Sequence, residues 1–228
     1  MTTLWQDIRY GLRMLVRSPG FAGVAVFSLA VGIGLNSVMF SLVDQGGLQK
    51  LPVQEPERIV NVSKTDYPTG FAYADRADLA DQCTSFVDVV AMCDEAAVTD
   101  YLELPRQLST NVVSRNYFAF LGLHPAAGRF FSQAESPDVQ AEPAAVLSYR
   151  VWQRDFGGDP AIIGKSIGLS GRTLTVIGVA PKGFAGTRRY APEDCWIPAE
   201  IWHAGSPRWL TSRTVPMCHL LARLRPEV

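Results

Sequence analysis

The chain has 228 residues, of which 19% are charged, and its formal net charge is −1. This balance excludes the basic face of a nucleic-acid-binding protein, so no nucleic-acid partner is expected. The mean hydropathy of +0.07 is high for a soluble protein, and one long apolar segment explains much of it.

Residues 1–20 are predicted to form an amphipathic helix at the cytoplasmic surface of a membrane. Four apolar residues recur on one side at helical spacing: Leu4, Ile8, Leu12 and Leu15. Three basic residues follow another side: Arg9, Arg13 and Arg17. An apolar face in lipid with arginines at the headgroups is typical of an interfacial helix. A helix that packs on a soluble domain is the alternative, and "SPG" at residues 18–20 should end either one.

Residues 21–43, "FAGVAVFSLAVGIGLNSVMFSLV", are predicted to be a transmembrane helix. The run has no charged residue and would form about 34 Å of helix, enough to cross a hydrocarbon core of about 30 Å. Asn36 is its strongest polar side chain, and such an asparagine can bond to a neighbouring membrane helix. A cleaved export signal and a soluble core helix are the alternatives. Both are disfavoured, because a signal's apolar run is about 7–15 residues and a core helix shows a polar stripe.

The charges that flank the apolar run predict its orientation. Arg9, Arg13 and Arg17 precede it, whereas Asp44 follows it and the next base is Lys50. Because basic residues accumulate on the cytoplasmic side of membrane helices, we expect a cytoplasmic N-terminus. The chain should therefore cross the inner (cytoplasmic) membrane once and carry its main domain in the periplasm.

The rest of the chain predicts an α+β fold behind a linker. Residues 44–57 are rich in glycine, proline and polar residues and form the expected linker, and residues 58–228 form the domain. Alternating or apolar runs predict strands over residues 58–64, 85–93, 96–105, 106–114, 144–149, 195–201 and 217–224. The expected helices and turn are a helix over 70–82, a short helix capped by Ser114 or Asn116 that ends at Gly122, a helix over 150–157, and a hairpin within 164–181 that turns at Gly171.

The cysteines fit an exported domain without fixing how they pair. All four follow the apolar run: Cys83, Cys93, Cys195 and Cys218. None forms a CxxC or zinc spacing, and a periplasmic location permits disulfides. Cys83 and Cys93 could pair locally, whereas free buried thiols are the alternative.

The sequence lacks the motifs of the common catalytic sites. It contains no GxxxxGK[ST] phosphate loop, no GxSxG elbow and no HExxH pair. The histidines, His124, His203 and His219, are scattered and are expected to be ordinary surface or half-buried residues. The aromatic residues Trp152, Phe156, Trp196 and Trp202 are expected to pack in the core or at its rim. We therefore predict no catalytic, cofactor-binding or metal-binding residue, no cofactor and no enzyme activity.

Five segments in a fixed order carry a resemblance to a known family. They are residues 4–44, "PERIV", "NYFAFLGLHPAAGRFF", "AAVLSYRVWQRDFGGDPAIIGKSIGLSGRTLTVIGVAPKGF" and "ARLRP". Together they resemble the ABC transporter permeases with a MacB-like periplasmic core domain, the FtsX-like or MacB-type permeases, and in particular large permeases of the acidobacterial type. The resemblance implies a membrane helix followed by a periplasmic domain with a porter-like α+β subdomain and a β-rich inserted subdomain.

The same resemblance implies a function in efflux or mechanotransmission. The permease would couple ATP hydrolysis by a separate ABC ATPase to work on substrates at the periplasmic side. Further membrane helices and the end of the periplasmic domain are missing from the sequence, so we expect an N-terminal fragment. It would be completed by a second permease copy or by the missing C-terminal half. The alternative function is a membrane-anchored periplasmic binding or interaction module that acts without an ATPase.

Overall fold

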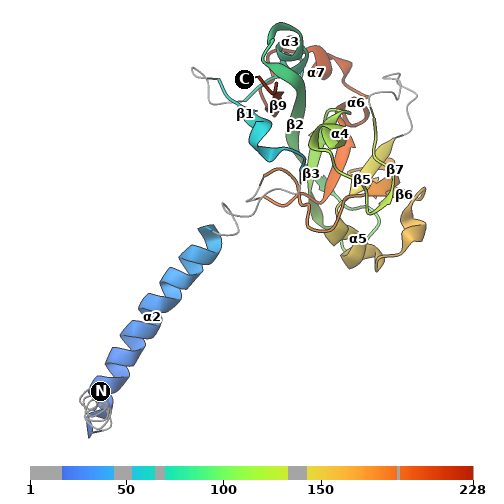
Figure 1. The fold of residues 1–228 in the computed structure, drawn as a ribbon. Helices are drawn as coiled ribbons and strands as arrows, with labels where there is room; N and C mark the ends of the chain where they lie inside the picture. The colour runs from blue at the N-terminus through green and yellow to red at the C-terminus, as the bar shows by residue number, and fades with distance from the viewer. Residues whose placement is uncertain (1–16, 44–52, 65–69, 133–142, 189–190, 228) are drawn as a thin grey trace. The chain divides into compact units, whose positions relative to one another are not determined.

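A computed structural model describes residues 17–43, 53–64, 70–132, 143–188 and 191–227 (Figure 1). The chain divides into two compact units: the helical unit, Met1–Gln49, and the sheet domain, Lys50–Val228. Residues 1–16 of the predicted interfacial helix and residues 44–52 of the predicted linker lie outside the described residues, so both remain predictions.

The helical unit contains α2 (Pro19–Val43), a helix of 25 residues and therefore about 37 Å long. It begins two residues before the predicted start, because proline is well suited to the first helical position. The break predicted over residues 18–20 falls at Ser18 alone, which is not helical, since Pro19 and Gly20 belong to α2. Its carbonyl accepts the first helical bond, from the Ala22 amide at 3.0 Å.

Most of the described side chains of α2 are apolar and exposed. Its exposed large apolar residues are Val24, Val26, Phe27, Leu29, Val31, Ile33, Leu35, Val38 and Met39. A helix in the core of a soluble protein buries such residues. Within the described part of the chain, α2 is the one helix long and apolar enough to cross a membrane, over Ala22–Met39.

The sheet domain is built on one mixed sheet, which confirms the predicted α+β class. Its strands, in spatial order, are β1 (Ile59–Val62), β9 (Cys218–Leu224), β2 (Phe86–Val98), β3 (Gln107–Val113), β8 (Cys195–Pro198), β5 (Ala144–Leu147), β7 (Arg172–Val179) and β4 (Ala127–Gly128). The strand β6 (Ser166–Leu169) also pairs with β7. The β3–β8 and β5–β7 pairs are parallel, and the other pairs are antiparallel.

Short helices cover the sheet. The α-helices are α3 (Asp75–Gln82), α4 (Tyr117–Leu121), α5 (Tyr149–Phe156), α6 (Ala199–Trp202) and α7 (Pro207–Thr211), and the 3-10 helices are η2 (Pro56–Arg58) and η3 (Pro160–Ile162). The helix α3 lies against β2, and α6 lies against β3 and β8 (Figure 1). The predicted stop at Gly122 is confirmed, because this glycine ends α4 with φ at 66°.

Both faces of the sheet are buried. Residues 89–93 of β2 are all buried, and alternate side chains enter opposite cores, because successive residues of a strand point to opposite faces. The first core contains Val89, Ala91 and Cys93, and the second contains Val90 and Met92. Four aromatic residues occupy core or rim positions as predicted: Trp152, Phe156, Trp196 and Trp202.

Three strand predictions needed adjustment, and the hairpin did not. In place of the expected strands 85–93 and 96–105 there is one strand, β2, which continues as far as the Val98–Gln107 pair of its ladder with β3, whereas residues 99–105 lie outside it. The strand expected over 195–201 ends at Pro198, which cannot donate to a ladder, and α6 follows. The hairpin between β6 and β7 turns at Ser170 and Gly171, both with positive φ, as a type I′ turn requires.

Candidate functional site

The first described residues after α2, residues 53–58, are bonded to two distant parts of the chain, the end of α4 and the end of β9. The Gln54 amide donates to the Leu121 carbonyl at 3.0 Å. The Arg58 guanidinium donates from Nε and Nη2 to the Leu224 carbonyl at 3.1 and 2.6 Å. The 53–58 segment is thereby fixed to α4 and to β9.

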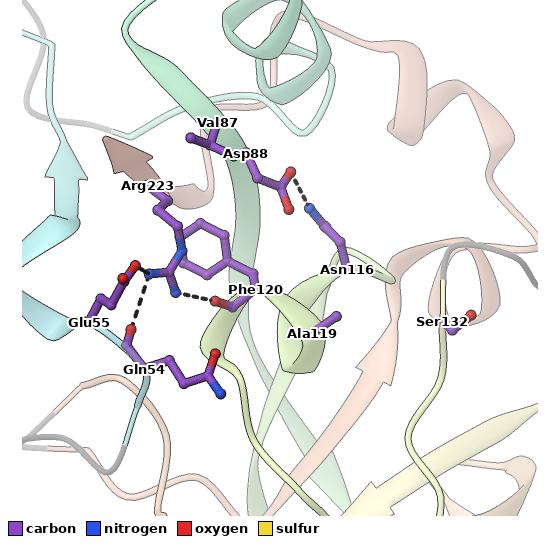
Figure 2. A pocket seen from close by; sticks show the side chains of 9 residues that line it. All are labelled: Gln54, Glu55, Val87, Asp88, Asn116, Ala119, Phe120, Ser132 and Arg223. Atoms are coloured by element: carbon purple, nitrogen blue, oxygen red, sulfur yellow. Dashed lines mark hydrogen bonds and ion pairs between the residues drawn. The ribbon is translucent and has the colours of Figure 1, made fainter. Parts of the chain in front are cut away.

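Arg223 on β9 completes this attachment. It donates from Nη1 to the Gln54 carbonyl at 3.1 Å and from Nη2 to the Phe120 carbonyl at 2.6 Å. Its Nη1 also lies 3.3 Å from Glu55 Oε2, and its guanidinium lies over the Phe120 ring, 5.3 Å from the centroid. Figure 2 shows Arg223 pointing between these groups. We call this arrangement the Arg223 clamp: Gln54, Glu55, Arg58, Phe120 and Arg223.

The first cavity lies beside the clamp and has a volume of about 550 Å³. Its lining residues are Gln54, Glu55, Val87, Asp88, Asn116, Ala119, Phe120, Ser132 and Arg223 (Figure 2). Asn116 occupies the N-cap position of α4, but its side chain does not cap the helix. Its amide instead donates to Asp88 Oδ1 at 2.8 Å and to the Val89 carbonyl at 3.0 Å, and Ser114 Oγ accepts from the Ala91 amide, so the cap position predicted for Asn116 is confirmed but neither side chain caps the helix.

The second cavity has a volume of about 350 Å³. Its apolar lining residues are Val53, Pro56, Ile59, Met92, Leu121 and Leu221. Its polar lining residues are Asn61, Thr187, Arg188 and His219. Because this lining includes residues on both sides of η2 and residues of the sheet, the cavity lies between the 53–58 segment and the sheet.

A fully buried carboxyl group, Glu193, lies near this cavity. Its Oε1 accepts a bond from Asn111 Nδ2 at 2.7 Å, and its Oε2 accepts one from the indole of Trp196. Burial raises the pKa of Glu193 to about 7, although the bonds from Asn111 and Trp196 and the nearby Arg188 charge oppose the rise. Glu193 therefore titrates near neutrality while its neighbours hold it in place.

Arg188 joins Glu193 to a second acid. Its Nη1 donates to Asp94 Oδ2, and its Nε lies 3.8 Å from Glu193 Oε1. On the other side of Asp94, His219 Nε2 lies 3.9 Å from Oδ2. Arg188 thus stands between two carboxyl groups, one fully buried and one partly exposed.

The cysteine pairing differs from the local one considered above. Cys93 on β2 forms a disulfide with Cys218 on β9, because antiparallel pairing places the two residues opposite each other. Cys83 lies just past α3 and is free, so the Cys83–Cys93 pairing is wrong. Cys195 is also free and is buried, which agrees with the alternative of buried thiols for that residue.

The histidines stay apart, as the sequence predicts. His203 stacks on Trp209 with ring centroids 3.6 Å apart. Its pKa is lowered to about 4, mainly by burial and to a smaller extent by the positive charge of Arg172. His219 is at the second cavity, and His124 follows α4. Across the described ranges, no three His, Cys, Asp or Glu side chains gather as metal ligands would.

Sequence reasoning identified neither the Arg223 clamp nor the Glu193 cluster. The bonded residues Gln54 and Arg223 are 169 positions apart, and no spacing rule connects them. For Glu193, the available signal was a pair of acids directly before the apolar strand "CWIP", a place where a carboxyl group is easily drawn into the core.

Comparisons with known proteins match the chain, and not these individual features, to a family. The family model described as "MacB-like periplasmic core domain" matches residues 22–228. No curated protein matches the chain.

Two solved structures have a similar fold. The extracellular domain of the noncanonic ABC-type transporter YknZ from Gram-positive bacteria is 16% identical over 73% of this chain and 82% of that chain, with a TM-score of 0.52. The periplasmic region of MacB from Actinobacillus actinomycetemcomitans is 14% identical over 75% of this chain and 74% of that chain, with a TM-score of 0.55. At these identities the likeness concerns the fold alone.

Proposed function

The chain belongs to the family of MacB-like periplasmic core domains of ABC transporter permeases, and on this premise we propose a role in ATP-driven export. The chain would act as the N-terminal part of a permease that couples ATP hydrolysis by a separate ABC ATPase to export or mechanotransmission at the periplasmic side. It would contribute no catalytic residue, since the ATPase partner hydrolyses the nucleotide.

The observation that carries this proposal is the Arg223 clamp. Residues 53–58, the first described residues after α2, are bonded to α4 and to the last strand of the sheet. A displacement that reaches residue 53 along the chain would therefore move the sheet domain rather than only bend a loose connection. A permease that transmits motion requires such a stiff attachment.

We further propose that α2 spans the inner membrane with its N-terminus in the cytoplasm and the sheet domain in the periplasm. The exposed apolar side chains of α2 and the arginines before it support this placement. The Cys93–Cys218 disulfide supports it too, because disulfides persist in oxidising compartments.

The proposed layout keeps the boundaries expected from the sequence. Residues 1–20 would lie at the cytoplasmic membrane surface, 21–43 in the bilayer, 44–57 in the linker and 58–228 in the periplasmic core domain. The clamp supports one addition to this layout: the end of the linker, from Gln54 onward, would move together with the core domain.

The alternative proposal is a membrane-anchored periplasmic binding module that acts without an ATPase. The second cavity favours it, because a concave and mostly apolar pocket with a few polar groups is typical of a ligand site. Under this alternative the domain would bind its ligand equally well whether or not an ATPase is bound.

The two proposals are separated by purifying the tagged full chain from its native membranes under mild detergent. The first requires an ABC ATPase in the purified complex, at a fixed ratio to the chain, with vanadate-sensitive ATP hydrolysis. Arg223→Met should leave that ATPase bound, but its rate of ATP hydrolysis should no longer respond to added transport substrates. A purified chain that is homogeneous, folded and free of any ATPase would contradict the permease role.

A further inference from the structure

We propose that the second cavity is a binding site for a small carboxylate with an aliphatic body. The ligand would lie between the 53–58 segment and the sheet, with its apolar part on the cavity floor and its carboxylate at Arg188. The inference does not depend on the proposed transport function, because it concerns binding to the sheet domain alone.

The floor of the cavity suits an aliphatic group. Six of the ten described residues that line it are apolar, and they come from the 53–58 segment, α4 and three strands of the sheet. Met92 and Leu121 are buried in the second core and therefore form a rigid base. An aliphatic chain placed here would leave water for an apolar wall, which is the main favourable contribution to such binding.

The charges on the lining suit an anion. Among the described lining residues, the two ionisable ones, Arg188 and His219, are bases. The two acids that balance them, Asp94 and Glu193, are not part of the lining, and Glu193 is fully buried. A carboxylate that entered the cavity would therefore meet the bases first.

Arg188 can bind a carboxylate without giving up its present partners. Its side chain is 33% exposed, and its Nη1 and Nε face Asp94 and Glu193. Nη2 donates no hydrogen bond to another described residue, so this nitrogen is available to a ligand. A charge-assisted bond of this kind is stronger than one between neutral groups.

The first cavity provides the contrast. Two acids, Glu55 and Asp88, line it, and the one base among its described lining residues, Arg223, already holds two carbonyl groups and Glu55. An added carboxylate there would face two negative charges. The two cavities are therefore expected to differ in the sign of the ligands they accept.

The test uses the full chain in lipid nanodiscs and ¹⁹F NMR titration with 8-fluorooctanoate, with empty nanodiscs as the background. The charge-reversed probe is 8-fluorooctylammonium. We expect saturable binding of the carboxylate and at least tenfold weaker binding of the ammonium. No saturable carboxylate signal above empty nanodiscs, or equal binding of the two probes, would overturn the proposal.

Three variants locate the site. Asn61→Trp places an indole at an exposed position on the cavity rim and should weaken octanoate binding at least tenfold. Val87→Trp makes the matched change at an exposed position of the first cavity and should change nothing. Arg188→Gln should weaken binding of the carboxylate about tenfold. If Arg188→Gln fails to fold, the tryptophan pair decides: equal binding by both tryptophan variants rejects the site.

Discussion

Cys93 and Cys218 are joined by a disulfide between the paired strands β2 and β9, across 125 positions of sequence. In the chain-entropy model a cross-link over a loop of this size restricts the unfolded chain by about 4–5 kcal/mol, and losses of about 2–5 kcal/mol are typical for native disulfides. We expect the double change Cys93→Ala and Cys218→Ala to lower the free energy of unfolding by that typical amount. Urea unfolding of the full chain in detergent, followed by tryptophan fluorescence, measures it.

Cys83→Ala is the control for this prediction, because Cys83 is free and half-buried. It should shift the free energy of unfolding by about 0.5 kcal/mol or less, as surface changes do. An unchanged urea midpoint in the double variant would show that the disulfide does not stabilise the domain.

A charge in the middle of α2 tests the membrane placement. Val31→Arg puts a guanidinium near the centre of the apolar helix, which costs about 2.5–3.5 kcal/mol on insertion scales. We expect the variant to be lost from the carbonate-washed membrane fraction. Leu104→Arg, at a residue of the sheet domain that is 83% exposed, is the control and should be recovered normally.

The orientation of α2 can be tested independently. Fusions of alkaline phosphatase and of a fluorescent protein after residue 18 and after residue 60 should report opposite sides of the membrane. The phosphatase is expected to be active only at position 60. Activity from the same side at both positions would contradict a single crossing.

Removing the key side chain of the Arg223 clamp should loosen residues 53–58. Arg223→Met keeps the length of the side chain but leaves the Gln54 and Phe120 carbonyls without their donor, at a cost of about 1–3 kcal/mol. Hydrogen exchange should quicken at the Gln54 amide, which is bonded to Leu121. Arg225→Met, one residue past β9, removes one exposed bond to the Thr84 carbonyl and should leave that exchange rate unchanged.

The features predicted correctly from the sequence are those that depend on neighbouring residues. The features that it did not predict are contacts between residues far apart in the chain. Alternation and turn residues located the hairpin at Gly171 and the stop at Gly122, since both depend on positive φ within a few residues. The Cys93–Cys218 bond and the Arg223 clamp depend on β9 returning to a place between β1 and β2. That arrangement is set by the packing of the whole sheet, which no local window contains.

The buried Glu193 carboxyl should make stability depend on pH. The pKa of Glu193 is about 7 in the folded chain, against 4.5 for an ordinary glutamate, the value taken for the unfolded chain. Between these two pH values the folded chain therefore binds more protons than the unfolded chain. The free energy of unfolding should therefore fall as pH rises from about 4.5 to 7, by on the order of 3 kcal/mol, and then level off. Glu193→Gln removes the titration, so its unfolding midpoints at pH 5 and pH 8 should differ less than those of the wild type. Equal pH dependence in both proteins would assign the effect to other groups.

Position 186 requires a glycine because the Glu193 carboxyl group lies directly against it. Its φ is +102°, and a Cβ at this position would overlap the Glu193 carboxyl, whereas a Cβ at Gly183, with φ at +90°, would meet nothing. Gly183→Ala therefore measures backbone strain alone, about 1–2 kcal/mol, because alanine is rarely found at positive φ. Gly186→Ala causes the same strain and also displaces Glu193 from Asn111 and Trp196. We therefore expect it to lower the free energy of unfolding at least twice as much as Gly183→Ala does. Urea unfolding of the two variants side by side measures the difference. Combining Gly186→Ala with Glu193→Ala should recover part of the loss, since the overlap is then gone; no recovery would mean that Gly186 serves the backbone and not the carboxyl group.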